Sequence, residues 1–259
     1  MCIRDRKVPE ESLPLVTVPA SSARAQQSSF ADLFAQRKLF WLTVIVWIGA
    51  STANYGVFLW GPTIVALMMG VTPVEVAHLF VIVSLTGMAG RVAFSLAPQW
   101  IGRRRCGAIM AYGIAISLGL AAIFYDRTLF GYPAFIVLLI PAAIFFDGGF
   151  SNIAPYSAEI FPVQLAARGV GLAQAANGIG KIAGPLCLAL IAGTSNLITP
   201  KATIEAVTPA FLFLAACGLA IGLAFTLLGV ETHGKPLTLE KGEADAATPE
   251  AFAMREQAS

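Results

Sequence analysis

Charged residues are scarce in this chain of 259 residues. Only 12% of the residues are Asp, Glu, Lys or Arg, and 57% are hydrophobic, whereas a soluble domain carries about 25% charged residues. So few charges cannot cover the surface of a soluble domain. The high apolar content also excludes an intrinsically disordered chain. The composition therefore predicts an integral membrane protein.

Clustered cysteines, clustered histidines and nucleotide-binding loops are lacking as well. Cys106, Cys187 and Cys217 lie in apolar runs, which is typical of small buried residues rather than of a disulfide framework. The two histidines lie far apart, and no glycine loop of a phosphate-binding type is present. We therefore expect no enzyme, no cofactor, no metal site and no nucleic-acid partner.

Long apolar stretches dominate what is present. About 20 mostly apolar residues suffice for a helix to span a bilayer, and six stretches qualify: 40–67, 77–100, 106–125, 131–157, 169–193 and 209–230. None shows the two-residue alternation of a barrel strand, so the predicted fold class is an all-α membrane protein with a six-helix transmembrane bundle at 40–230. Residues 1–39 are interpreted as a flexible, loop-like cytoplasmic segment with a short amphipathic helix near 29–39, and 231–259 as a cytoplasmic tail.

The basic residues of the connections predict the orientation. The connections on one side hold only Arg127 and Lys201. Those on the other side, which include both termini, hold a much larger set: Arg4, Arg6, Lys7, Arg24, Arg37, Lys38, Arg103, Arg104, Arg105, Arg168, Lys235, Lys241 and Arg255. Because Lys and Arg accumulate on the cytoplasmic side, we expect both termini in the cytoplasm and the bundle in the cell (inner or plasma) membrane.

Polar residues lie deep in four of the six stretches. They are Asn54, Tyr55, Arg91, Asp147, Asn152 and Lys181. A charge at the bilayer centre costs about 2.5–3.5 kcal/mol on insertion scales, so such residues face protein or a water-filled cavity. We expect four helices to line a polar space and the stretches 106–125 and 209–230 to support them from the lipid side.

The polar positions also repeat with a period of three helices. In the first and fourth stretches, a polar residue precedes a glycine, and a proline follows six residues after that glycine. In the second and fifth stretches, a basic residue directly follows a glycine. The matching segments are Asn54–Pro62 with Asp147–Pro155, and Gly90–Arg91 with Gly180–Lys181. Three helices reverse the chain, so the sequence predicts two inverted three-helix repeats, an arrangement typical of secondary transporters.

Three cytoplasmic loop motifs carry a family resemblance. They are Gly102–Arg105, the segment Tyr156–Pro162 followed by Arg168, and Glu231–Glu240, which reads Glu-Thr-His-Gly-Lys-Pro-Leu-Thr-Leu-Glu. In this order they resemble the major facilitator superfamily, in its branch of sugar porters and metabolite–proton symporters, over about residues 30–240. The resemblance implies twelve helices in two halves, of which this chain is similar to the C-terminal half alone. We therefore expect a truncated fragment whose partner is a missing N-terminal six-helix half.

Several positions depart from the hexose-transporting members. Gln99, Trp100 and Ala166 replace the acid and bases of the loop motifs, and the paired Gln of the first helix and the Trp before Glu159 are absent. The segment Gly178–Pro185 is more similar to the eleventh helix of symporters for aromatic acids and nicotinate. The resemblance then implies secondary active transport of a small organic anion, such as an aromatic or other carboxylic acid, by proton symport and alternating access. A sugar porter remains one alternative, and a non-transporting membrane sensor or assembly subunit is another.

The candidate site residues follow from charge and from the resemblance. Arg91 and Lys181 are candidates to bind a substrate carboxylate, and Asp147 is the candidate proton-coupling acid, with a structural ion pair to either base as the alternative. Asn54, Tyr55 and Asn152 are candidate substrate contacts or interhelical hydrogen-bond partners. The resemblance also implies a cytoplasmic gate, for which simple anchoring at the membrane surface is the alternative. Its residues are Arg103, Arg104, Arg105, Glu159 and Arg168.

Overall fold

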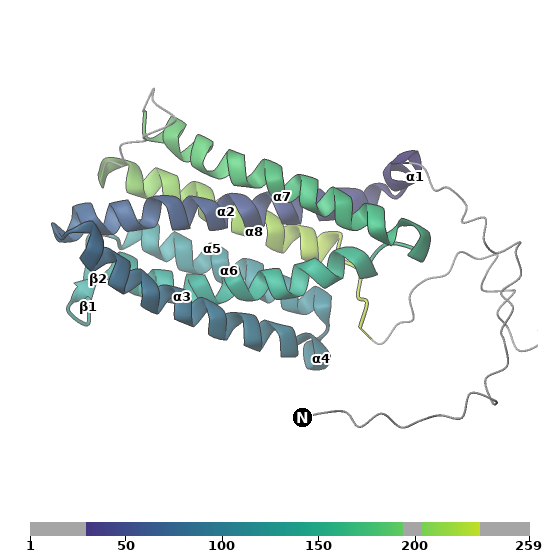
Figure 1. Cartoon of the computed structure of the whole chain (residues 1–259), viewed down its shortest axis with the longest axis horizontal. Helices are drawn as coiled ribbons and strands as arrows, with labels where there is room; N and C mark the ends of the chain where they lie inside the picture. The colour runs from purple at the N-terminus through teal and green to yellow at the C-terminus, as the bar shows by residue number, and fades with distance from the viewer. Residues whose placement is uncertain (1–29, 194–203, 234–259) are drawn as a thin grey trace, which may run out of the picture.

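The computed structural model describes residues 30–193 and 204–233, which are almost entirely helical (Figure 1). The long helices are α2 (Arg37–Met69), α3 (Pro73–Leu96), α5 (Arg103–Ile123), α6 (Ala134–Glu159), α7 (Val163–Ile191) and α8 (Val207–Leu227). The short elements are α1 (Phe30–Ala35), α4 (Pro98–Ile101), β1 (Thr128–Leu129), β2 (Tyr132–Pro133) and the 3₁₀ turn η3 (Ile204–Ala206). The predicted segments 1–29 and 234–259 lie outside the described residues.

Five segments of the described chain are long and apolar enough to cross a membrane. They are α2, α3 continued through α4, α5, α6 and α8. The predicted all-α class is thus confirmed, and five of the six predicted spans meet this criterion. Helix α7 is also long, with 29 residues, but it is not among the five; its polar side chains include Arg168, Gln174, Asn177 and Lys181.

Local sequence signals make the sharp reversal between α2 and α3. Helix α2 ends at Gly70, whose backbone φ of 63° is left-handed and whose N–H donates to the carbonyl of Ala66. Thr72 and Glu75 then form a capping box, in which each side chain accepts a hydrogen bond from the backbone N–H of the other residue. Pro73 occupies the first turn of α3, where its missing N–H costs nothing.

The other reversals mark the two ends of the bundle. Gly102, with a φ of 83°, separates α4 from α5, and we call this the α4 end. At the opposite end, the hairpin end, β1 and β2 pair antiparallel between α5 and α6, with Thr128 opposite Pro133 and Leu129 opposite Tyr132. The α4 end lies at the right of Figure 1 and the hairpin end at its left.

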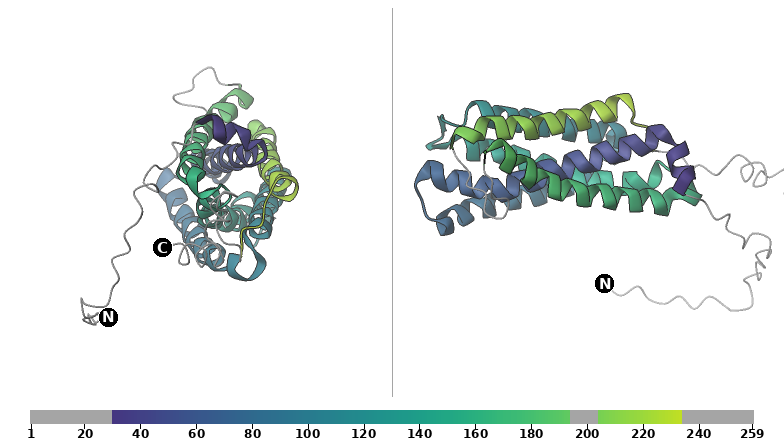
Figure 2. Two further views of the ribbon diagram at one scale, coloured as in Figure 1. Left: turned by 90° about the vertical axis from the view of Figure 1, so that its right-hand side faces the viewer. Right: turned by 90° about the horizontal axis from the view of Figure 1, so that it is seen from above.

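The long helices pack in a definite order. Helix α2 packs mainly against α7 and α8, α6 packs mainly against α3 and α5, and α5 packs against α8. Viewed end-on in Figure 2, α5 and α8 lie together on one side of the bundle and α7 lies on the other. Helices α3 and α7 therefore make fewer contacts within the chain than the four central helices do.

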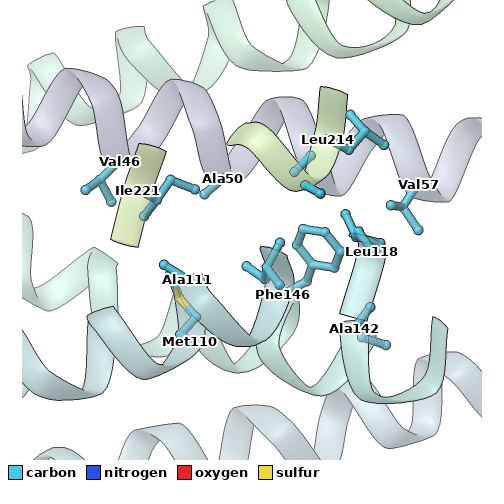
Figure 3. Close-up of a cluster of buried hydrophobic side chains, with 14 of the residues drawn as sticks. Val46, Ala50, Val57, Met110, Ala111, Leu118, Ala142, Phe146, Leu214 and Ile221 are labelled. Atoms are coloured by element: carbon cyan, nitrogen blue, oxygen red, sulfur yellow. The ribbon is translucent and has the colours of Figure 1, made fainter. Parts of the chain in front are cut away.

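Buried apolar side chains from α2, α5, α6 and α8 form the core (Figure 3). Labelled members are Val46, Ala50, Val57, Met110, Ala111, Leu118, Ala142, Phe146, Leu214 and Ile221. Each is less than a tenth exposed. This core holds α2 and α6 in place, and these two helices carry four of the six predicted substrate-site residues: Asn54, Tyr55, Asp147 and Asn152.

Candidate functional site

Arg91 and Asp147 form an ion pair between α3 and α6. The Arg91 Nη2 atom lies 2.8 Å from the Asp147 Oδ1 atom. The Asp147 side chain is 16% exposed and the Arg91 side chain 56% exposed. The sequence allowed either Arg91 or Lys181 as the partner of Asp147. The structure pairs Asp147 with Arg91. The acid of the pair is half-buried and the base is exposed, so a solute could approach the guanidinium.

Glycines set the close approach of α3 to α6 at this pair. A side chain at Gly87 would collide with the Asp147 carboxylate, and one at Gly90 would collide with the backbone of Ile144. The missing side chains let the two helices lie near enough for Arg91 to reach across. The Gly90–Arg91 dipeptide noted in the sequence thus has a structural basis.

Lys181 and Tyr55 form a second polar contact, between α7 and α2. The Lys181 Nζ atom lies 5.1 Å from the centre of the Tyr55 ring, within the range of a cation–π interaction. The Tyr55 side chain is exposed, as is Lys181. Among the described residues, no carboxylate lies within ion-pair distance of Lys181. This leaves a cation beside an aromatic face and available to a ligand carboxylate.

A polar network that sequence reasoning missed lies one turn away. The Ser51 hydroxyl donates to the Asn177 Oδ1 atom at 2.7 Å, and the Asn177 amide donates to the Gln174 Oε1 atom at 3.1 Å. Gln174, Asn177 and Lys181 share one face of α7, because they are spaced by three and then four residues. That spacing was the signal in the sequence that could have revealed the network.

The α2–α7 contact is again made through glycines. A side chain at Gly180 would meet the Ile48 carbonyl and the Ser51 side chain, and one at Gly184 would meet the Thr52 backbone. The Thr52 hydroxyl donates to the Gly180 carbonyl at 3.3 Å. Close packing here fixes the position of the neighbouring Lys181 backbone relative to α2.

The two predicted asparagines lie in different surroundings. Asn54 is half-buried on α2 next to Tyr55, and its side chain has no recorded hydrogen bond within the described residues. Asn152 is fully buried, and its amide donates to the Arg103 carbonyl at 3.1 Å. The structure therefore places Asn152 with the predicted gate residues, away from the exposed Arg91 and Lys181. A role in substrate contact stays a prediction for both asparagines.

The predicted gate residues gather at the α4 end. Arg103 forms an ion pair with Glu159, whose Oε2 atom also accepts a hydrogen bond from the Thr232 hydroxyl at 2.8 Å. The Glu231 Oε1 atom accepts from the backbone N–H of Arg103 at 2.9 Å. These contacts tie the start of α5, the end of α6 and the segment after α8 to one another. The sequence motif that begins at Glu231 is thereby joined to the other two loop motifs.

The remaining gate candidates are arranged separately. Arg104 donates from Nε to the Phe225 carbonyl at 3.1 Å and from Nη2 to the Thr226 carbonyl at 2.6 Å. Arg105 is exposed, and Arg168 on α7 is half-buried. Of the five predicted residues, Arg103 and Glu159 form an ion pair with each other.

The described residues contain no group of three or more His, Cys, Asp or Glu placed to hold a metal ion. Instead, the site offers one ion pair and one cation without a carboxylate partner in the described chain, each on a glycine-mediated helix contact. Such an arrangement can bind a charged solute.

Comparison with known proteins gives two findings. Residues 4–242 match the family model described as "Sugar (and other) transporter". The niacin transporter NiaP of Acinetobacter baylyi is 28% identical over 222 residues, which cover 83% of this chain and 46% of that protein. The chain thus spans about half the length of this curated relative.

Proposed function

The chain belongs to the sugar (and other) transporter family of the major facilitator superfamily, and on that basis we propose that it forms one six-helix half of a proton-coupled transporter for a small organic anion. Family membership indicates a transport protein rather than an enzyme, and a protein that crosses the membrane several times. The substrate, the coupling ion and the second half are the parts we propose.

Lys181, which has no carboxylate partner among the described residues, is the observation that carries the substrate class. A cation deep in a membrane helix is expensive unless a negative partner balances it. Tyr55 beside it offers a flat apolar face, and such a pair suits an aromatic carboxylic acid: the carboxylate meets Lys181 and the ring meets Tyr55. The matched relative carries the name of a niacin transporter, and niacin is an aromatic carboxylic acid.

The Arg91–Asp147 pair supports proton coupling. When Asp147 is ionised, it holds the Arg91 guanidinium. Protonation of Asp147 would remove that attraction and free Arg91 to bind a substrate carboxylate. A proton and an anion would then load together and leave together, as symport requires.

The helix contacts support two inverted repeats and alternating access. If α2, α3 and α5 correspond to α6, α7 and α8, the contact of α2 with α7 corresponds to that of α6 with α3, and the α5–α8 contact corresponds to itself. Both pairs are prominent in the bundle. We propose that α3 and α7, the helices with most exposed surface, face a preceding half, and that the ion pair of Arg103 and Glu159 closes the cytoplasmic side.

The charges at the two ends support the orientation. Arg37, Lys38 and the arginines Arg103–Arg105 all lie at the α4 end, whereas Arg127 lies at the hairpin end. By the positive-inside rule, the α4 end lies on the cytoplasmic side of the cell membrane, and both termini are proposed to lie on that side.

Uptake into proteoliposomes tests the proposal. The chain, reconstituted with its N-terminal half, should accumulate radiolabelled niacin when the outside is made more acidic, and the Asp147→Asn variant should exchange niacin without accumulating it. Accumulation of glucose instead would favour a sugar porter, which the family description also allows. Niacin binding without uptake in any condition would favour a sensor or an assembly subunit.

A further inference from the structure

A cavity of about 560 Å³ lies at the α4 end, apart from the Arg91 and Lys181 sites. It opens where α5 begins and α8 ends. The side chains that matter for its chemistry are Trp100, Arg104, Arg105, Phe225, Glu231 and His233. Arg105 is a predicted gate residue but is not part of the Arg103–Glu159 ion pair, and Trp100 has no role in the transport or gating proposed above.

The cavity lies at the level of the membrane surface. Helices α5 and α8 are both long and apolar enough to span, and the cavity is lined by the first turns of α5 and the last turn of α8. Trp100 on α4 is 76% exposed. Exposed tryptophan at the end of a span is typical of the interface where lipid head groups lie.

Hydrogen-bond donors are available in the cavity. Arg104 uses two of its five N–H donors in hydrogen bonds to the Phe225 and Thr226 carbonyls, in the last turn of α8. This holds the guanidinium in place and leaves three donors without a recorded partner in the described chain. Arg105 is exposed and has no recorded partner among the described residues.

The one carboxylate in the wall is already engaged. The Glu231 Oε1 atom accepts from the backbone N–H groups of Arg103, Thr232 and His233. Its negative charge is therefore directed at the start of α5. The two positive charges of Arg104 and Arg105 outnumber this one negative charge in the cavity wall. The remaining titratable group, the His233 ring, adds no negative charge. The cavity as a whole favours an anion.

An apolar stripe leads away from the cavity along α5. Ile109, Ile116 and Ile123 are each at least half exposed. The three isoleucines are spaced by seven residues, and Arg105 precedes Ile109 by four residues. All four therefore share one helix face. A basic group above an apolar stripe matches a molecule with an anionic head and a hydrocarbon tail.

We propose that this cavity binds the phosphate head group of an anionic phospholipid, with an acyl chain along the α5 stripe. Phosphatidylglycerol has the required chemistry. Basic cavities between helices on the cytoplasmic side bind such head groups, and each Lys or Arg near the surface strengthens the attraction about fivefold. This inference rests on the proposed orientation but not on the proposed substrate. A failure of niacin uptake would therefore not contradict it.

Quenching of Trp100 fluorescence tests the site. The 259-residue chain is reconstituted in phosphatidylcholine vesicles that contain brominated phosphatidylglycerol or, at the same mole fraction, brominated phosphatidylcholine. The contribution of Trp100 is the difference between the wild type and the Trp100→Phe variant. We expect phosphatidylglycerol to be enriched beside Trp100, and Arg105→Gln to lower the enrichment about fivefold.

Two controls distinguish a bound lipid from free phosphate, and a specific site from general attraction to the basic end of the bundle. Arg37 lies at the same end but outside the cavity, so Arg37→Gln should keep the enrichment, and an equal loss would show general surface attraction and overturn the proposal. Added inorganic phosphate should not displace the lipid, and displacement would identify a free-anion site instead. Equal quenching by the two lipids would also overturn it. Native mass spectrometry of lipid retained per chain provides a second measurement that does not depend on Trp100.

Discussion

The ion pair between Arg91 and Asp147 is asymmetric, and this asymmetry gives a sharp prediction. Arg91→Gln leaves the Asp147 carboxylate, only 16% exposed, without its partner. Asp147→Asn instead leaves the Arg91 guanidinium, which is 56% exposed and can extend toward solvent or a head group. Loss of the base should therefore destabilise the bundle more than loss of the acid.

The expected magnitude follows from the burial of the two partners. Breaking a fully buried pair costs about 3–5 kcal/mol, whereas an exposed pair contributes about 0–1 kcal/mol. This pair lies between the two limits because the arginine is more than half exposed. We expect Arg91→Gln to lower the free energy of unfolding by about 1–2 kcal/mol and Asp147→Asn by less than about 1 kcal/mol.

Reversible unfolding in mixed detergent micelles, followed by circular dichroism, measures both values. The double variant should recover part of the Arg91→Gln loss, because it removes the stranded carboxylate. Arg127→Gln is the matched control, since Arg127 and Asp126 are 4.0 Å apart and largely exposed. If Asp147→Asn cost as much as Arg91→Gln, or if the control did, the reasoning from burial would be wrong.

Three further predictions concern the other contacts. Gly180→Ala should destabilise by about 1–3 kcal/mol, because a side chain there meets the α2 backbone, while Gly178→Ala on the same helix, with open space around it, should be neutral in the same unfolding assay. Lys181→Gln should abolish binding of niacin measured by calorimetry and Lys181→Arg should retain it; equal affinities would remove the carboxylate argument. Glu159→Gln should lower stability by about 1 kcal/mol or less, since both partners of its ion pair are partly exposed, and should raise the rate of niacin exchange; an unchanged rate would exclude a gating role.

Much of the fold could be predicted from residue order alone. Apolar runs long enough to span gave the positions of the long helices, because burial in lipid requires a continuous hydrogen-bonded backbone. The bounds differ at the ends: α2 begins at Arg37 and α7 at Val163, where the sequence predicts 40 and 169. Helices extend beyond the apolar run in these places because polar first turns can lie outside the hydrocarbon.

The partners of the polar residues were harder to predict. Sequence reasoning left Asn152 open between a substrate contact and an interhelical hydrogen bond, and could not name its partner, the Arg103 carbonyl. It also passed over Ser51 and Asn177, because neither is charged and single polar residues are common in spanning helices. Which face of a helix a residue occupies depends on how that helix is rotated against its neighbours.

The sequence by itself determined that this protein is a helical membrane protein, and which of its apolar stretches contain a charged residue. Hydropathy and charge placement are properties of the chain and need no partner. Only the tertiary structure decided that Asp147 pairs with Arg91 and that Lys181 lies over Tyr55. Those pairings depend on glycines that let α3 approach α6 and α7 approach α2. They also depend on how each helix is rotated and shifted along its axis relative to its neighbour.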